Sequence, residues 1–130
     1  MRLGTTINGK EFLSYAVDGM IIATPTGSTA YNLSARGPIL SPSMRAMLMT
    51  PVSPHMLFDR SMVLDGSEVL ELTVIGDRSA SVVADGQHIS TVAPGSSVIC
   101  KQSDRPARVV TFGERDFRQT LKAKFGLMDR

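Results

Sequence analysis

Residues 18–34, with the sequence DGMIIATPTGSTAYNLS, bring together chemical groups that suit the binding of a nucleotide. An apolar run leads into a turn that contains a glycine and four hydroxyl side chains, which are Thr24, Thr26, Ser28 and Thr29. Glycine permits close approach of a ligand to the backbone, and free N–H groups at a helix start attract anions and sugar oxygens. Tyr31, at the start of the short helix expected over residues 30–35, offers a stacking face for a base. We therefore predict a nucleotide site here.

A purely structural interpretation of the same turn stays open. A Pro-Thr-Gly-Ser turn can simply cap a helix, with Ser28 or Thr26 as the cap residue, and Tyr31 can belong to an ordinary core. The chain contains neither G-x-x-x-x-G-K-[ST] nor G-x-G-x-x-G, so no phosphate-binding fingerprint decides between the two. The G-x-S-x-G elbow of many hydrolases is also absent, which argues against a serine hydrolase.

The remaining candidate residues are two histidines and two aspartates. His55 and His88 have no second His or Cys at metal-ligand spacing, so we expect no metal site. Asp18 and Asp85 each lie in a turn beside an apolar run. A carboxylate in such a place can bind ribose hydroxyls or can merely form the turn, and both interpretations remain.

The elements that position these residues are mainly β-strands. Turn signals such as Asn8-Gly9 and Asp85-Gly86 separate short runs rich in Val, Ile, Leu and Thr, which is typical of antiparallel β domains. The expected strands are residues 2–7, 11–16, 20–23, 47–51, 68–75, 81–84, 97–101 and 108–112. We predict a mainly β, antiparallel, β-sandwich-like domain with one short helix after the TPTGST turn. A C-terminal helix is expected over residues 114–125, where an apolar stripe is formed by Phe117, Leu121 and Phe125.

Composition narrows the classes of protein further. The 130 residues, 42% hydrophobic and 20% charged, fit one globular domain. A net charge of +2 does not point to nucleic acid or a membrane surface as partner, and no apolar stretch approaches the ~18 residues of a membrane helix. The lone Cys100 excludes an internal disulfide and is expected to be a buried structural thiol. We expect a cytoplasmic protein.

Four segments of the chain together resemble the C-terminal domain of NAD kinases. They are DGMIIATPTGSTAYNLSARGPI, TPVSPHMLFDRSMVL, VVADGQ and FRQTLKAKFG, in the family's order and at suitable separations over most of the chain. The first segment is the most specific, because the related lipid and sphingoid kinases share the general fold without that string. The resemblance implies that residues 1–130 form the C-terminal, mainly β domain of a two-domain α/β plus β kinase.

The resemblance also implies a reaction and partners. NAD kinases transfer the γ-phosphoryl group of ATP, or in some members of polyphosphate, to the 2′-hydroxyl of the adenosine ribose of NAD, which gives NADP. Magnesium or another divalent ion assists by neutralising charge. The family's C-terminal domain supplies much of the NAD site and builds the homo-oligomer, so a dimer or tetramer with NAD sites across subunits is implied.

The family's motifs imply which residues of this chain contact NAD. The T-A-Y-x-x-S segment holds the dinucleotide, with Tyr31 packed against a base, and comprises Thr29, Ala30, Tyr31, Asn32, Leu33 and Ser34. Asp18 is expected to reach NAD from a neighbouring subunit, and Ser53 is expected to offer a backbone contact. Gln87, with Asp85 beside it, is expected to make another contact. Ala16 occupies a position where some members place a basic NAD contact.

Departures from the family pattern limit these expectations. The Gly-Gly-Asp-Gly motif, whose aspartate is the expected base for the 2′-hydroxyl, is absent, as is the Asn-Glu or Asn-Asp pair that binds adenine and ribose. Both belong to the N-terminal α/β domain, which we expect upstream of Met1, so this chain should hold no catalytic residue and be inactive alone. Arg36 replaces the first glycine of the usual Gly-Gly-Pro-Ile, so its backbone must avoid positive φ or be strained. The alternative is a non-catalytic nucleotide-binding or assembly module with the same fold.

Overall fold

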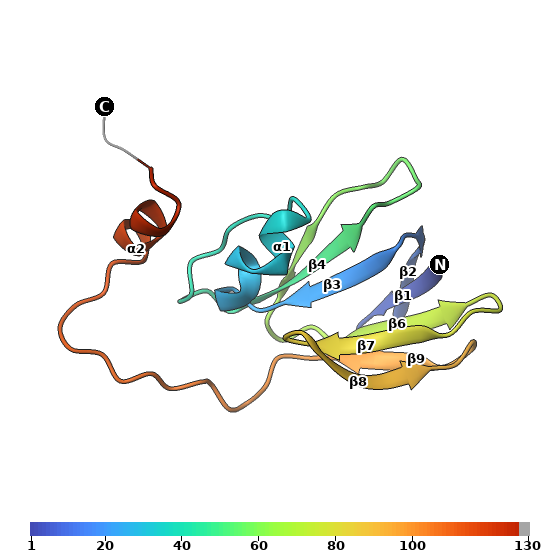
Figure 1. Ribbon diagram of the computed structural model, residues 1–130. Helices are drawn as coiled ribbons and strands as arrows, with labels where there is room; N and C mark the ends of the chain where they lie inside the picture. Colours follow the sequence, from blue (N-terminus) through green and yellow to red (C-terminus); the bar gives the residue numbers. More distant parts are fainter. Residues whose placement is uncertain (128–130) are drawn as a thin grey trace.

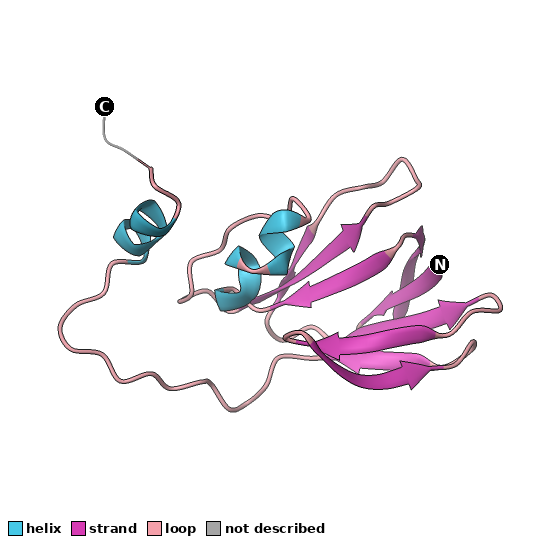
Figure 2. Ribbon diagram, viewed as in Figure 1, coloured by secondary structure: helices cyan, strands magenta, loops and turns pink. Residues whose placement is uncertain are grey.

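A computed structural model describes residues 1–127, and Figures 1 and 2 show a molecule built mainly of strands. In chain order the elements are β1 (Arg2–Ile7), β2 (Lys10–Ala16), β3 (Gly19–Ala23), the 3-10 helix η1 (Thr26–Thr29), α1 (Tyr31–Ser34), β4 (Ala46–Val52), β5 (Met62–Asp65), β6 (Leu70–Ile75), β7 (Ala80–Ala84), β8 (Gln87–Val92), β9 (Ser97–Cys100) and α2 (Phe117–Lys124). The strands form three sheets, in the orders β2-β1-β6-β9, β3-β4-β5 and β7-β8. Every pairing within them is antiparallel, which confirms the predicted fold class.

In two hairpins the turn is formed by a dipeptide that the sequence identifies as a turn signal. The turn between β1 and β2 places Asn8 and Gly9 at φ values of 50° and 76°, and the turn between β7 and β8 places Asp85 and Gly86 at 47° and 83°. Two successive residues with positive φ are the signature of a type I′ turn, whose twist matches that of the flanking strands. Asn-Gly and Asp-Gly are favoured there because both residue pairs tolerate this region, so the predicted hairpins are confirmed.

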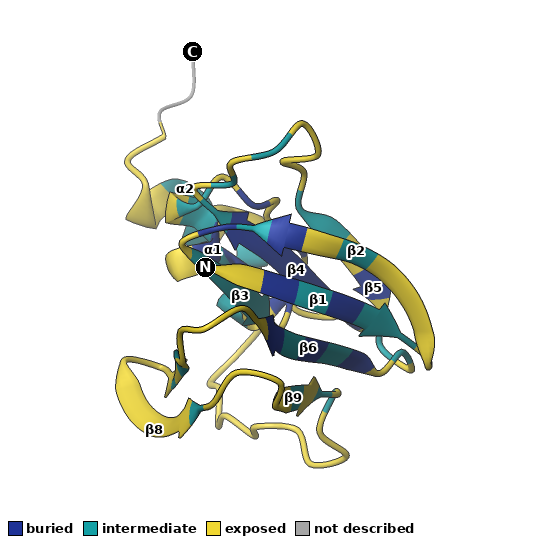
Figure 3. Cartoon of the chain, turned by 90° about the vertical axis from the view of Figure 1, so that its right-hand side faces the viewer, coloured by how far each residue is buried: buried dark blue, intermediate teal, exposed yellow. Residues whose placement is uncertain are grey.

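The main core lies between the four-stranded and the three-stranded sheet. In β6 the side chains of Leu70, Leu72 and Val74 are buried on one face, as the alternation predicted. Met47 and Met49 of β4 meet them from the other sheet. Figure 3 shows this buried band along β1, β6 and β4, whereas β8 is exposed. Burial of these apolar side chains is the main stabilising contribution to the sandwich.

Strand β4 is buried on both of its faces. Leu48, which alternates with the two core methionines, packs with Ala46 and Leu40 in a second apolar cluster. The adjoining short helices η1 and α1 lie over the β3-β4-β5 sheet, as Figure 1 shows. β4 therefore separates the sandwich core from the layer that carries the TPTGST turn, and it provides a rigid base for that turn.

Cys100 is half-buried at the end of β9, less enclosed than the sequence led us to expect. Its side chain packs against the edge of the main core. Burial raises the pKa of the Cys100 thiol. The thiol therefore stays protonated near neutral pH, as a small apolar group in the packing.

The segment after β9 contradicts one predicted strand. Residues 108–112 were expected to be a strand, but residues 101–116 contain neither strand nor helix. Val109, Val110 and Phe112 are 73%, 84% and 98% exposed. Branched and aromatic residues favour a strand only where a neighbouring strand pairs with them, and residues 1–127 supply no such partner here. Figure 1 shows this segment, the arm (residues 101–116), as an extended connection that leads to α2.

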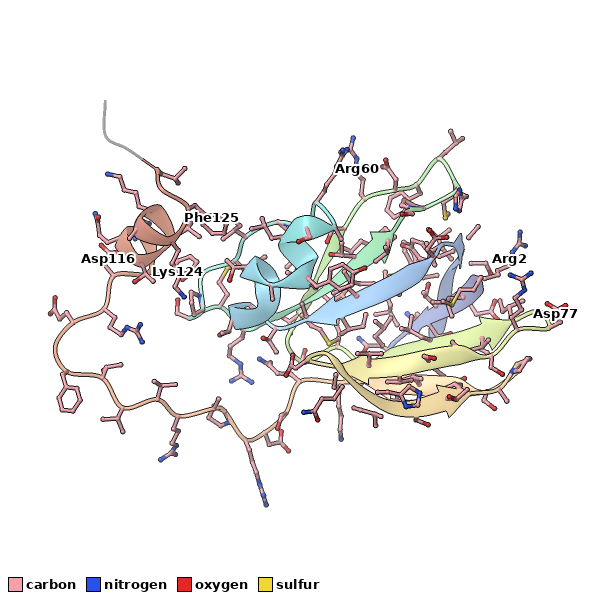
Figure 4. The ribbon with its side chains drawn as sticks, in the orientation of Figure 1. Arg2, Arg60, Asp77, Asp116, Lys124 and Phe125 are labelled. Atoms are coloured by element: carbon pink, nitrogen blue, oxygen red, sulfur yellow. The ribbon has the colours of Figure 1, made fainter. Side chains whose placement is uncertain are left out.

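Helix α2 is confirmed but is shorter than predicted. The carboxylate of Asp116 accepts a hydrogen bond of 2.9 Å from the Arg118 N–H, and the Asp116 backbone is extended, with φ −96° and ψ 112°. Asp116 therefore caps the helix, which begins at Phe117 instead of residue 114. Figure 4 shows Asp116 at the start of α2 and Lys124 and Phe125 at its end. Neither α2 nor any other helix within residues 1–127 is long and apolar enough to cross a membrane.

Arg36 follows α1 in the left-handed region, with φ 65°. The Gly37 N–H donates to the Asn32 carbonyl (2.8 Å) and the Arg36 N–H to the Leu33 carbonyl (3.0 Å). This pair of bonds is the Schellman motif, which usually has glycine at the position that Arg36 occupies. Of the two alternatives expected for Arg36 in place of glycine, avoidance of positive φ or a strained backbone, the structure shows the strained backbone.

We expect Arg36→Gly to raise the free energy of unfolding by about 1 kcal/mol, because glycine adopts positive φ without the Cβ clash. Urea denaturation followed by circular dichroism measures this difference. Arg36→Ala is the matched control, since it removes the guanidinium but keeps a Cβ, and it should leave the stability close to that of the parent chain. Equal stabilities of the glycine and alanine variants would contradict the assignment of strain to the backbone.

Candidate functional site

The TPTGST turn is held together by its own hydroxyl groups. Ser28 is fully buried, and its hydroxyl donates to the Pro25 carbonyl (2.6 Å) and accepts from the Leu40 N–H (3.0 Å). The Thr24 hydroxyl accepts from the Gly27 N–H at 3.1 Å. These bonds connect the turn to the loop before β4, so the role of the Ser28 hydroxyl is structural.

Neither residue proposed as a helix cap performs that role. The N-cap position of α1 is Ala30, which has no side-chain acceptor, and η1 likewise begins without a side-chain cap. The Thr29 hydroxyl lies 3.5 Å from the Thr26 carbonyl, at the limit of a hydrogen bond. The capping interpretation of Ser28 and Thr26 is therefore wrong, because both lie in η1, before the N-cap position Ala30 of α1.

Asn32 lies in the interior, with 1% of its surface exposed. Its amide nitrogen donates to the carbonyls of Ser28 (2.9 Å) and Pro38 (3.0 Å). Its amide oxygen accepts from the Thr50 hydroxyl of β4 at 2.6 Å. Gly37 packs so closely on this amide that a Cβ at position 37 would collide with it. Both N–H donors of Asn32 are thus engaged within the protein, and no hydrogen of this amide is left for a ligand.

A groove of about 580 Å³ runs between α1 and the segment that connects β4 to β5. It is called here the Tyr31 groove, and its lining residues are Tyr31, Ser34, Ala35, Arg36, Thr50, Pro51, Val52, Ser53, Pro54, Asp59, Arg60 and Ser61. Tyr31 is 63% exposed, which rules out an ordinary core role and leaves its ring available for stacking. The fold therefore brings three predicted site residues, Tyr31, Ser34 and Ser53, to one groove.

The rim of the Tyr31 groove carries two arginines and one aspartate. Arg60 Nε lies 3.6 Å from Asp59 Oδ1, and both side chains are largely exposed. Figure 4 shows Arg60 extending outward near α1. Arg36 adds a second guanidinium to the lining. The excess of positive charge favours a ligand that carries phosphate, for which the planar guanidinium is well suited.

A second group of predicted residues meets where β2, β3 and β4 adjoin. The Asp18 N–H donates to the Val52 carbonyl (3.0 Å), and the His55 N–H donates to the Ala16 carbonyl (2.8 Å). His55 Nε2 lies 3.5 Å from Asp18 Oδ1. Ala16 and Asp18 therefore lie beside the loop that holds Ser53, and the His55 ring lies close to the Asp18 carboxylate.

Other predicted residues lie apart from the groove, and some groove residues were not predicted. Asp85 and Gln87 belong to the β7-β8 hairpin, are exposed, and do not line the Tyr31 groove. Sequence reasoning missed Asp59, Arg60 and Ser61 as groove residues, because only the tertiary fold brings their loop to α1.

Within residues 1–127 no three His, Cys, Asp or Glu side chains gather into a group that could hold a metal ion. Magnesium prefers several oxygen ligands in octahedral geometry. The described residues therefore offer no site built of protein ligands alone, and no catalytic step is assigned to a metal bound by this chain.

Comparison with known sequences places this architecture in a family. The family model of the ATP-NAD kinase C-terminal domain matches residues 2–112. The NAD kinase of Heliobacterium modesticaldum is 40% identical over 125 residues, which are 95% of this chain and 44% of that protein. NAD kinase 1 of Streptomyces avermitilis is 40% identical over 129 residues, 98% of this chain and 36% of that protein. The chain thus spans less than half the length of these curated relatives.

Solved structures agree with the sequence comparison. Yeast NADH kinase in complex with NADH matches with a TM-score of 0.84 and 26% identity over 97% of this chain and 40% of its own. An Archaeoglobus fulgidus NAD kinase in complex with ATP matches with a TM-score of 0.71 and 29% identity, over 82% of this chain and 41% of its own. Since the family model covers well over half of the residues, the chain belongs to the ATP-NAD kinase C-terminal domain family.

Proposed function

We propose that this chain is the dinucleotide-binding domain of an NAD kinase, which phosphorylates the 2′-hydroxyl of the adenosine ribose of NAD with ATP or polyphosphate. The observation that carries the proposal is the exposed Tyr31 ring in a groove of about 580 Å³, within the segment that the family model matches. Relatives at 40% identity named NAD kinase support it.

The Tyr31 groove supplies three kinds of contact for a dinucleotide. The Tyr31 ring stacks on a base, a contact worth roughly 1–3 kcal/mol in nucleic-acid complexes. The Ser34 hydroxyl, one turn further along α1, can bond a ribose or amide group. Arg36 and Arg60 at the rim compensate the charge of the diphosphate. Thr29, Ala30 and Leu33 complete the contact segment around Tyr31.

Catalysis needs groups that this sequence does not contain. Magnesium and ATP would supply charge neutralisation and the phosphoryl group in the complete reaction. The Gly-Gly-Asp-Gly motif that resemblance associates with the base is absent from the 130 residues. The residues of this chain therefore bind and orient NAD, and a cytoplasmic location is part of the same proposal.

Self-association also belongs to the proposal. Asp85 and Gln87 lie on the β7-β8 hairpin, apart from the groove, so a second copy offers a route by which they contact NAD. The apolar side chains Ile89 of β8 and Ile99 of β9 are 63% and 67% exposed. Exposed apolar residues on these two consecutive strands favour contact with another surface. A homodimer or homotetramer would cover them.

Replacement of Tyr31 tests the binding role. Loss of the ring in Tyr31→Ala removes the stacking contact, so the affinity of the chain for NAD should fall roughly 5- to 150-fold. Tyr31→Phe keeps the ring and should bind within about twofold of the parent chain. Isothermal titration calorimetry gives both affinities. Unchanged binding by Tyr31→Ala would remove Tyr31 from the site.

An assay of NADP formation separates the binding domain from a complete kinase. We expect the 130-residue chain with magnesium and either ATP or polyphosphate to form no NADP, because the motif associated with the base is missing. The NAD kinase of Heliobacterium modesticaldum serves as the positive control in the same coupled assay. Turnover by the 130-residue chain would show that its own residues complete the reaction.

The oligomer can be measured by sedimentation velocity. We expect the parent chain to sediment as a dimer or tetramer, and Ile89→Glu to shift it toward monomer, because a buried unpaired charge is costly. Ser79→Glu adds the same charge at an exposed loop position and should leave the distribution unchanged. A parent chain that is monomeric at every concentration would refute self-association through this surface.

A further inference from the structure

Three hydroxyl and amide groups form a directed chain of hydrogen bonds, called here the Asn32 relay (Asn32, Thr50 and Ser61). The Asn32 amide faces the carbonyls of Ser28 and Pro38 on one side, at 2.9 and 3.0 Å. A carbonyl oxygen only accepts hydrogen bonds, so the group that faces both carbonyls must be the NH₂. The orientation of the Asn32 amide is thereby fixed, and its oxygen faces Thr50.

The orientation of the Asn32 amide determines the direction of the hydrogen bond between Asn32 and Thr50. The Asn32 oxygen can only accept, so the Thr50 hydroxyl donates its single hydrogen to it, at 2.6 Å. The Thr50 oxygen also lies 2.5 Å from the Ser61 oxygen. Since the Thr50 hydrogen is already used, Ser61 must be the donor in this second bond. The direction of donation therefore runs from Ser61 through Thr50 to Asn32.

Ser61 is the end of the relay at the wall of the Tyr31 groove. Its hydroxyl has a single hydrogen, which points to the Thr50 oxygen, with the Met49 carbonyl as a more distant acceptor at 3.3 Å. No hydrogen is left for a ligand. The Ser61 oxygen still has acceptor capacity, so the relay converts a hydroxyl, which usually both donates and accepts, into an acceptor only.

We propose that Ser61 is a specificity-determining residue that accepts a hydrogen bond from an NH₂ group of the bound nucleotide. The proposal rests on the proposed function, in which the ligand is NAD. NAD carries two such groups, the carboxamide of nicotinamide and the N6 amino group of adenine. A ligand that presents an oxygen acceptor at this place faces the Ser61 oxygen without a shared hydrogen, so its binding is weakened.

Two NAD analogues distinguish the two sources of the NH₂ group. Nicotinic acid adenine dinucleotide replaces the carboxamide NH₂ by oxygen, and nicotinamide hypoxanthine dinucleotide replaces the adenine amino group by oxygen. Calorimetry would measure the affinity of the parent chain and of Ser61→Ala for NAD and both analogues. We expect the parent chain to bind one analogue about tenfold more weakly than NAD, and Ser61→Ala to reduce that ratio to within about twofold.

The relay itself is tested at Thr50, a residue that is 1% exposed and bonds the Ser61 hydroxyl. Thr50→Val keeps the shape of the side chain but removes the nearer acceptor of the Ser61 hydrogen, and only the Met49 carbonyl at 3.3 Å remains within the protein. Ser61 can then donate to an oxygen of the analogue. The ratio of affinities should then fall toward one. Thr50→Ser restores the hydroxyl and should restore the ratio, which a merely structural role of Thr50 does not predict.

Controls separate the possible failures. Ser90→Ala changes an exposed serine of β8, outside the groove, and should keep the parent ratio. Thermal unfolding by circular dichroism shows whether each variant is folded. If the parent chain does not bind NAD, the proposed function fails and this inference fails with it. If NAD binds but the parent chain does not discriminate, or discriminates equally in Ser61→Ala, only the inference on Ser61 is overturned.

Discussion

The buried amide of Asn32 is the interaction on which the arrangement of the site depends. It connects η1 through the Ser28 carbonyl, the following loop through Pro38, and strand β4 through Thr50. A buried amide that loses a partner costs free energy, and bonds in a low-dielectric interior are mutually dependent. The position of α1, and with it the direction of Tyr31, is therefore defined by one side chain that contacts three separate segments.

Strand β4 allows this polar layer to coexist with an apolar core. One face of the strand presents Met47 and Met49 to the sandwich, and the other presents Leu48 and Thr50 to the helical layer. The groove is thus built directly on a strand that is fixed from both sides. Rigid elements beneath a binding site reduce the ordering that a ligand must impose.

The sequence predicted those features that depend on local chemistry. The Asn8-Gly9 and Asp85-Gly86 hairpins and the alternation of Leu70, Leu72 and Val74 follow from backbone preference and burial within a few residues. The sequence allowed Tyr31, two positions after the TPTGST turn, to be either a stacking ring or a core residue, and its exposure removes the second alternative.

Features that depend on distant partners could not be predicted. Residues 108–112 have the composition of a strand but no partner in the described part of the chain. Arg60 and Ser61 enter the groove only because their loop is folded against α1. The role of Asn32 depends on Thr50, 18 positions later in the sequence. A sequence motif contains residues that are adjacent in the chain, whereas the residues of the Asn32 relay become adjacent only when the chain has folded.

The left-handed conformation of Arg36 has a consequence for how such a domain can change over evolutionary time. The residue places a cation at the rim of the groove, but it does so at a helix end where glycine would be more stable. Selection for thermal resistance would favour glycine at this position, and selection for an anionic ligand would favour arginine. At position 36, therefore, the residue that gives the more stable fold differs from the residue that adds a positive charge to the groove. A more heat-resistant descendant with glycine at this position would need a lysine or arginine elsewhere at the rim.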